Sequence, residues 1–126
     1  MKFIRFHRTD KMKALTNEEF QFFGVDGHMF KLGNKIFEAI VNPDDGYRSY
    51  LETIQTKKNS NGVFFKAPLA IVRVECIPSD IPNDDAFTGY RLVDTADNHI
   101  WLSVGTDYSE DWYPHFVFRY QPRNPV

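Results

Sequence analysis

Signals for tight turns recur about every 8–12 residues along this chain, and the runs between them are rich in β-branched and aromatic residues. Gly33-Asn34 suits a two-residue hairpin turn, and Asn42–Gly46 and Asn59–Gly62 are further turn clusters. In the clearest run, Leu69–Ile77, strand alternation places one set of small and apolar residues on the same side: Ala70, Val72, Val74 and Cys76. This spacing predicts a chain built of many short strands.

Several of these runs are expected to pair with each other. His28–Leu32 should pair with Lys35–Val41, and Gly89–Asp94 with His99–Gly105, because each pair flanks a short turn. Further strands are expected at Lys2–Arg8, Tyr47–Lys57 and His115–Tyr120, the last with Phe116, Phe118 and Tyr120 on one face. We therefore predict a mainly β fold, a β-sandwich or small open barrel of about seven antiparallel strands.

One short N-terminal helix is also expected. Thr16 and Glu19 have the spacing of a capping box, in which each side chain accepts from the other residue's amide. Leu15 and Phe20 have the spacing of a hydrophobic staple, and Gly24 should end the helix.

The length of 126 residues fits one domain, predicted to span residues 1–120, with a tail at 121–126 that is expected to fray. The N-terminal residues lack the long apolar stretch of a secretion signal, and no apolar run reaches the roughly 20 residues of a membrane-spanning helix. Cys76 is the single cysteine, so no internal disulfide can form. These features predict a cytoplasmic protein that does not contact membranes.

Charge is unevenly distributed along the chain, although the net charge is only −2. Residues 1–13 carry five basic residues and one acid, a net of +4, and residues 80–111 carry eight acids and one arginine, a net of −7. A nucleic-acid-binding domain usually shows a basic excess, so the composition argues against nucleic acid as the main partner.

No motif in the chain indicates a particular reaction. The glycine patterns of phosphate-binding loops and the GxSxG motif of serine hydrolases are both absent. Alternation places Cys76 beside Val74 on an apolar face, which favours a core cysteine over a reactive thiol. We therefore expect no catalytic residues and no cofactor.

An alternative ligand site is formed by two turns, if the turns meet. Asp44, Asp45 and Arg48 lie in one, and Asp97 and His99, with Asp94 nearby, lie in the other. Carboxylates and imidazoles of this kind can bind a small molecule or a divalent metal, or serve a small enzyme. The same residues are typical of tight turns, and turn chemistry alone is the simpler explanation for them.

The 105–115 segment combines aromatic and acidic residues between two expected strands. Trp and Tyr are enriched in protein-binding hot spots, and acids favour a partner with a basic surface. The candidate partner-binding residues are Asp107, Tyr108, Glu110, Asp111, Trp112 and Tyr113. The alternative for Trp112 is that it folds back and fills the open end of the sandwich.

Two stretches also carry a family resemblance: Asp45–Leu51, and Trp101–Asp107 running on to Tyr113–Phe118. They resemble small uncharacterised β-rich accessory proteins of phages and mobile elements, over residues 45–120. The resemblance assigns no functional residue, but it implies a protein that binds and inhibits a host protein. The expected function is thus a small, cytosolic, non-enzymatic protein-binding module. The alternatives are the ligand-binding domain or small enzyme described above, and a self-associating structural subunit or homo-oligomer.

Overall fold

The computed structural model describes residues 15–42, 50–56, 65–78, 87–107 and 115–123. The strand expected at Lys2–Arg8 lies outside these residues. Within them, eight strands are present: β1 (Glu19–Asp26), β2 (Met29–Leu32), β3 (Lys35–Asn42), β4 (Tyr50–Thr56), β5 (Ala70–Pro78), β6 (Phe87–Asp94), β7 (Ile100–Asp107) and β8 (His115–Tyr120). The part of the chain that is described holds no helix that is long and apolar enough to cross a membrane.

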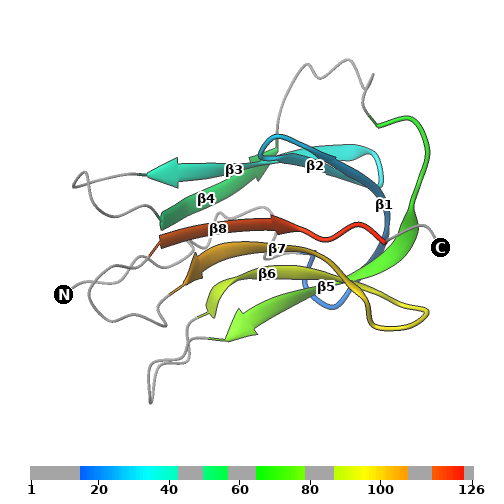
Figure 1. The fold of residues 1–126 in the computed structure, drawn as a ribbon. Helices are drawn as coiled ribbons and strands as arrows, with labels where there is room; N and C mark the ends of the chain where they lie inside the picture. The colour runs from blue at the N-terminus through cyan, green and yellow to red at the C-terminus, as the bar shows by residue number, and fades with distance from the viewer. Residues whose placement is uncertain (1–14, 43–49, 57–64, 79–86, 108–114, 124–126) are drawn as a thin grey trace.

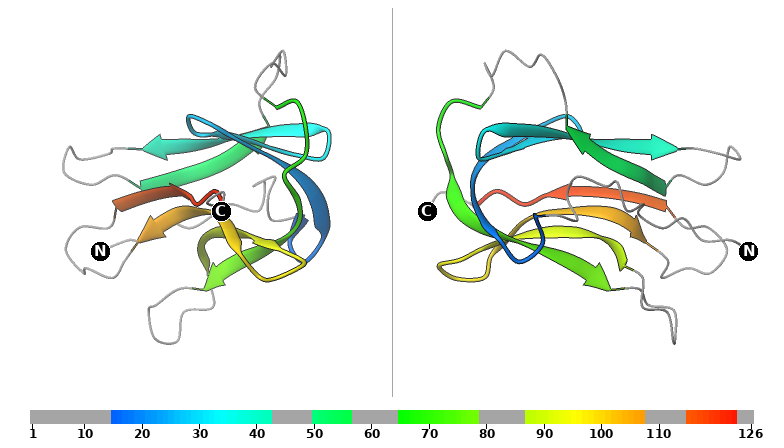
Figure 2. Two further views of the ribbon diagram at one scale, coloured as in Figure 1. Left: turned by 45° about the vertical axis from the view of Figure 1, so that its right-hand side comes forward. Right: turned by 180° about the vertical axis from the view of Figure 1, so that it is seen from behind.

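The eight strands form one open antiparallel sheet in the order β4-β3-β2-β1-β5-β6-β7-β8. The sheet curls strongly, so that β2, β3 and β4 lie over β5 to β8 as a second layer, and β1 passes from one layer to the other (Figures 1 and 2). The expected mainly β, antiparallel fold is confirmed. The sheet is continuous through β1, and its two edge strands, β4 and β8, are not paired with each other.

The expected N-terminal helix is wrong, because β1 occupies that segment. Phe20 and Phe22 face inward, while Glu19 and Gln21 are exposed, which is the two-residue period of a strand. The Thr16 hydroxyl does not form the capping box with Glu19. It lies 3.5 Å from the Cys76 sulfur instead. Pairing of β1 with β2 and β5 thus overrides the local capping signal.

The expected hairpins are present. β2 pairs with β3 around Gly33-Asn34, and Gly33 adopts a φ of 58°, a left-handed conformation that glycine tolerates well. β6 pairs with β7 across the 95–99 turn, where Asn98 has a φ of 65°. Asn is one of the few other residues that readily adopt this conformation, so both turns follow from their local sequence.

The core fills the space between the two layers. Phe30 on β2 contacts Phe118 on β8 with ring centroids 6.4 Å apart, and Phe22 on β1 contacts Tyr120 on β8 at 6.2 Å. The inward placement of Phe116, Phe118 and Tyr120 on β8 is confirmed. The buried members of the core are Phe22, Phe30, Leu32, Phe37, Ala39, Val72, Val74, Tyr90, Leu92, Trp101, Leu102 and Val104.

Strand β5 shows the predicted alternation. Val72 and Val74 are fully buried, and Ala70 and Cys76 pack against the core on the same side. Leu69, just before the strand, and Ile71 lie on the outer face and are 48% and 42% exposed. Cys76 is half-buried, as an apolar-face cysteine should be.

Candidate functional site

Six strand ends lie at one end of the sheet. β3 ends at Asn42 where β4 begins at Tyr50, β5 ends at Pro78 where β6 begins at Phe87, and β7 ends at Asp107 where β8 begins at His115. Figures 1 and 2 show these three pairs of strand ends on the same side of the molecule. The connecting segments 43–49, 79–86 and 108–114 therefore all start and finish at this end.

We call these strand ends and their three connections the acidic end. The connections together contain seven acids and one arginine, a net charge of −6. The chain as a whole is −2, so the remainder of the chain carries +4. Asp107 adds one more carboxylate where β7 ends. The sheet thus brings to one end the strand ends that flank these three segments, whose acids are up to 67 positions apart in the sequence, from Asp44 to Asp111.

Most of the predicted partner-binding residues belong to the third connection. Asp107 is half-buried and pairs with His115 across the last rung of the β7–β8 ladder. Tyr108, Glu110, Asp111, Trp112 and Tyr113 lie outside the described residues, and so do Asp44, Asp45 and Arg48. For the 108–114 and 43–49 segments, the structure thus describes only the strand ends on either side.

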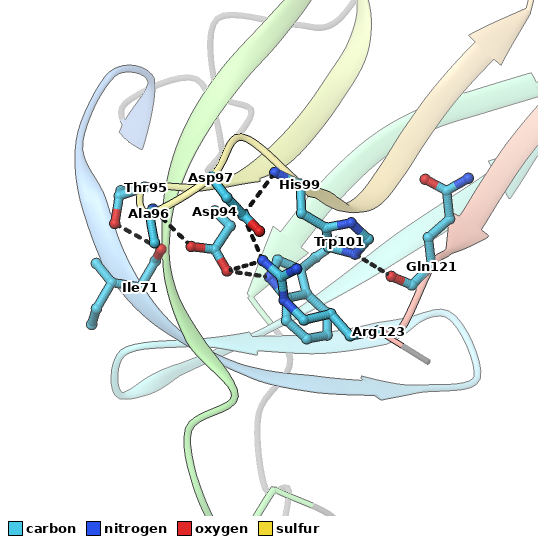
Figure 3. Close-up of polar contacts among 9 residues, drawn as sticks. All are labelled: Ile71, Asp94, Thr95, Ala96, Asp97, His99, Trp101, Gln121 and Arg123. Carbon is cyan, nitrogen blue, oxygen red and sulfur yellow. Dashed lines mark hydrogen bonds and ion pairs between the residues drawn. The ribbon is translucent and has the colours of Figure 1, made fainter. Parts of the chain in front are cut away.

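At the opposite end of the sheet, a polar network surrounds Asp94 (Figure 3). Asp94 ends β6 and is only 6% exposed. One of its carboxylate oxygens accepts from the Ala96 amide at 2.9 Å. The other accepts from the Trp101 indole at 3.0 Å and from the Arg123 guanidinium at 2.9 Å. Three donors therefore satisfy this buried carboxylate.

Asp97 and His99 belong to the same network. Asp97 accepts from Arg123 and from the His99 amide. The His99 ring lies 2.7 Å from the Gln121 carbonyl oxygen and edge-on to Trp101, with ring centroids 5.0 Å apart. The Gln121 amide in turn donates to the Trp101 carbonyl, which ties the segment after β8 to β7. We call this group of residues the Asp94 network.

The charges of the Asp94 network stabilise each other. Burial raises the pKa of Asp94, but the hydrogen bonds from Ala96, Arg123 and Trp101 outweigh it, so the pKa lies below its usual value. The hydrogen bond from Arg123, with that from the His99 amide, lowers the pKa of Asp97. The same contacts with Asp97 and Asp94 raise the pKa of Arg123. Both carboxylates and the guanidinium are therefore charged at neutral pH.

This arrangement closes one end of the core. The Arg123 guanidinium binds both Asp94 and Asp97 and lies over the Trp101 ring, 5.5 Å from its centroid. Among the described residues, no group of three or more His, Cys, Asp or Glu side chains is placed to hold a metal ion. Asp97 and His99 lie at one end of the sheet, in the β6–β7 turn. Asn42 and Tyr50 lie at the other end, and they border the turn that contains Asp44, Asp45 and Arg48.

The sequence does not single out Trp101 or Arg123 as members of this network. Trp101 is the second residue of an apolar strand and is indistinguishable there from an ordinary core residue. Arg123 follows β8 among residues expected to fray, and its charge opposite to that of Asp94 and Asp97 is the one available signal. No protein-family model, curated protein or solved structure matches the chain, so its candidate sites depend on this geometry alone.

Proposed function

We propose that the chain is a non-enzymatic protein-binding module whose acidic end contacts a basic surface of its partner. One observation carries this proposal: the strand order brings the three connections with a net charge of −6 to one end of the sheet. Clustered charge of one sign raises the rate of encounter with an oppositely charged surface. The two acids at the other end, Asp94 and Asp97, are already bound to Arg123.

The acidic end also contains the residue types that give binding energy. Tyr108, Trp112 and Tyr113 occur in the connection between Asp107 and His115, and each offers a large rigid surface with a polar atom. The β7–β8 ladder is regular from Leu102–Tyr120 to Asp107–His115, so both ends of this connection are held by paired strands. A binding segment whose ends are fixed loses less conformational freedom when it binds.

The nature of the partner is part of the same proposal. The resemblance to accessory proteins of phages and mobile elements supports a host protein that the chain binds and inhibits. The single, half-buried Cys76 supports a reducing compartment, so we place binding of the partner in the cytoplasm.

The test is affinity capture from host lysate with the tagged protein, read by quantitative mass spectrometry. Glu110→Lys reverses one charge at the acidic end, and Glu18→Lys makes the same change on an exposed residue just before β1. We expect a protein that the wild type and Glu18→Lys retain and that Glu110→Lys loses at least about tenfold, because like charges across an interface repel. Equal retention by all three, or no protein retained by the wild type, overturns the proposal.

A second variant tests the aromatic contribution. Trp112→Ala should weaken the captured complex by about 2 kcal/mol or more while its far-UV circular dichroism and melting curve stay those of the wild type. Loss of the folded state in Trp112→Ala would show that this tryptophan belongs to the core and is not a binding anchor. Glu110→Lys would then decide the proposal alone.

A further inference from the structure

The outer face of β5, beside β1, has an exposed apolar patch. Leu69 and Ile71 are the large apolar side chains that are exposed among the described residues, at 48% and 42%. Both point away from the core, since Val72 and Val74 on the same strand are fully buried on the other side. Ile71 pairs across to exposed Gln21 on β1, so the apolar patch lies on the β5 side and a polar amide borders it on β1.

Two charges of opposite sign border this patch on adjacent strands. Glu19 on β1 is exposed and directly pairs in register with Arg73 on β5. Arg73 is partly exposed and also donates to Glu75 at 2.7 and 2.9 Å. The outer face therefore has, along the strand direction, a row with apolar Ile71 beside uncharged polar Gln21 and a charged row at Glu19–Arg73.

This pattern is self-complementary under two-fold symmetry. Consider a two-fold axis that runs parallel to the strands, midway between β1 and β5, in the plane of contact. The axis brings β1 of one copy opposite β5 of the other without a shift along the strands. Glu19 then faces the Arg73 of the second copy and Arg73 faces its Glu19. Each Ile71 faces the Gln21 of the second copy, and the two copies of Ile71 lie diagonally across the axis from each other. An isologous dimer needs this kind of self-matching surface.

We propose that the outer face of β1 and β5 binds a second copy of this chain, with Ile71 and Leu69 at the centre and two reciprocal Glu19–Arg73 ion pairs at the rim. Exposed apolar side chains rimmed by polar residues are typical of association surfaces. The rim charges set the register of the two copies, because any other alignment places like charges together or leaves them unmatched.

The symmetry also has a consequence for the acidic end. Because the axis runs parallel to the strands, the β5 strands of both copies run in the same direction. Both copies then present Pro78, and with it the acidic end, on the same side of the dimer. If the acidic end binds a partner, a step that depends on the proposed function, the dimer is a bivalent binder and gains from multivalency.

The experiment is sedimentation velocity on the purified full chain, without any partner, from about 1 µM to about 1 mM, the range in which a small interface associates. We expect the wild type to shift from monomer to dimer across this range. Ile71→Glu should stay monomeric at every concentration, because it places a carboxylate at the centre of the apolar contact. Leu69→Glu provides the same test if Ile71→Glu fails to fold.

A charge exchange tests the register. Glu19→Arg alone should weaken the dimer at least about tenfold, since it sets two arginines against each other, and the double variant Glu19→Arg with Arg73→Glu should restore most of the loss. Lys35→Glu, an exposed change at the β2–β3 turn, is the matched control and should leave association unchanged.

Three results would overturn the dimer: a wild type that stays monomeric, an association insensitive to Ile71→Glu, or a charge exchange that restores nothing. Glu110→Lys is predicted to leave the dimer intact, because it lies at the acidic end. A dimer that forms normally in a chain that captures no partner would contradict the proposed function and support this one.

Discussion

Asp94 is the residue on which one end of the core depends. A carboxylate that is 6% exposed costs several kcal/mol to bury unless its oxygens are hydrogen-bonded. Here three donors from three parts of the chain supply those bonds: the Ala96 amide in the turn, the Trp101 indole on β7 and the Arg123 guanidinium after β8. The contacts therefore tie the β6–β7 turn to the segment that follows the last strand.

Replacing Asp94 should accordingly be costly. Asp94→Ala removes the acceptor of the buried Trp101 indole and of Arg123, and we expect it to lower the free energy of unfolding by about 2 kcal/mol. Asp97→Ala should have a clearly smaller effect, because Asp97 is exposed and surface ion pairs contribute little. Urea denaturation of the two variants and the wild type measures both. An Asp97→Ala effect as large as that of Asp94→Ala would contradict the role assigned to burial.

The pH dependence of stability follows from the same carboxyls. The folded chain holds the pKa of Asp94 and Asp97 below their unfolded values, so the unfolded chain takes up protons first as the pH falls. Their stabilising contribution is complete well above about pH 4, the unfolded pKa, and is lost as the pH falls through the lower folded values.

The difference in unfolding free energy between wild type and Asp94→Asn should therefore be constant from about pH 8 to pH 5 and shrink below about pH 4. Urea denaturation across this pH series measures it, with Lys35→Glu as a surface control. A difference that grows on acidification would mean that Asp94 is destabilised as a carboxylate in the folded state, which is the reverse sign.

At this scale the sequence predicted where the residues lie but not what they bind. The sequence predicts Asp97 and His99 as residues of a ligand site, and the structure uses both in a network with Asp94. The decisive partner, Arg123, lies 26 positions from Asp97. Local spacing carries no information about a contact of that kind, since the strand order has to be known first.

At the scale of elements, the backbones of β6 and β7 approach each other closely at Gly89. Gly89 and Gly105 pair directly with each other, and both are buried. A Cβ on Gly89 would lie against the Val104 carbonyl oxygen and 2.8 Å from the Gly105 Cα, which a real side chain does not allow. Glycine within a strand often marks such a close approach of two backbones.

Gly89→Ala should therefore lower the free energy of unfolding by at least about 2 kcal/mol, because β6 and β7 must separate locally. Gly27→Ala is the control, since nothing lies within 4 Å of its added Cβ and only its φ of 60° opposes the change. That backbone strain alone should cost about 1 kcal/mol. Urea denaturation of both variants gives the comparison, and equal effects would argue against the steric explanation.

Strands were predictable where alternation and turn chemistry agree. The β2–β3 and β6–β7 hairpins have turn residues whose positive φ suits glycine and asparagine, so their pairing follows from a few neighbouring residues. The segment after Thr16 has two conflicting signals: a capping box favours a helix, whereas Phe20 and Phe22 alternate with polar residues as in a strand. Pairing with β5, some 50 residues later, settles the conflict, and no local pattern reveals that partner.

At the scale of the whole molecule, the strand order determines where the charges gather. Six of the seven neighbouring strand pairs join strands that follow each other in the chain, but the pairing of β1 with β5 is what bends one sheet into two layers. It also sends the 43–49, 79–86 and 108–114 connections to the same end. Sequence reasoning recognised the acidic segments separately and had no means to bring them together.

The continuous sheet also predicts how the molecule unfolds. The buried core draws on β1, β2 and β3 from one side and on β5, β6 and β7 from the other, so neither layer has a core of its own. We expect a single cooperative transition, with Trp101 fluorescence in a Trp112→Phe background coinciding with far-UV circular dichroism.

Trp101 is the appropriate probe because it contacts Phe22 on β1, with ring centroids 5.8 Å apart, and is closed off by Arg123. It therefore reports on the junction of the two layers, whereas circular dichroism reports on the strands as a whole. If the fluorescence transition came at lower urea concentration than the loss of strand signal, the Asp94 network would open before the sheet does. The Asp94 network would then unfold locally and separately from the sheet. Asp94→Ala should in that case shift the fluorescence transition but not the circular dichroism transition.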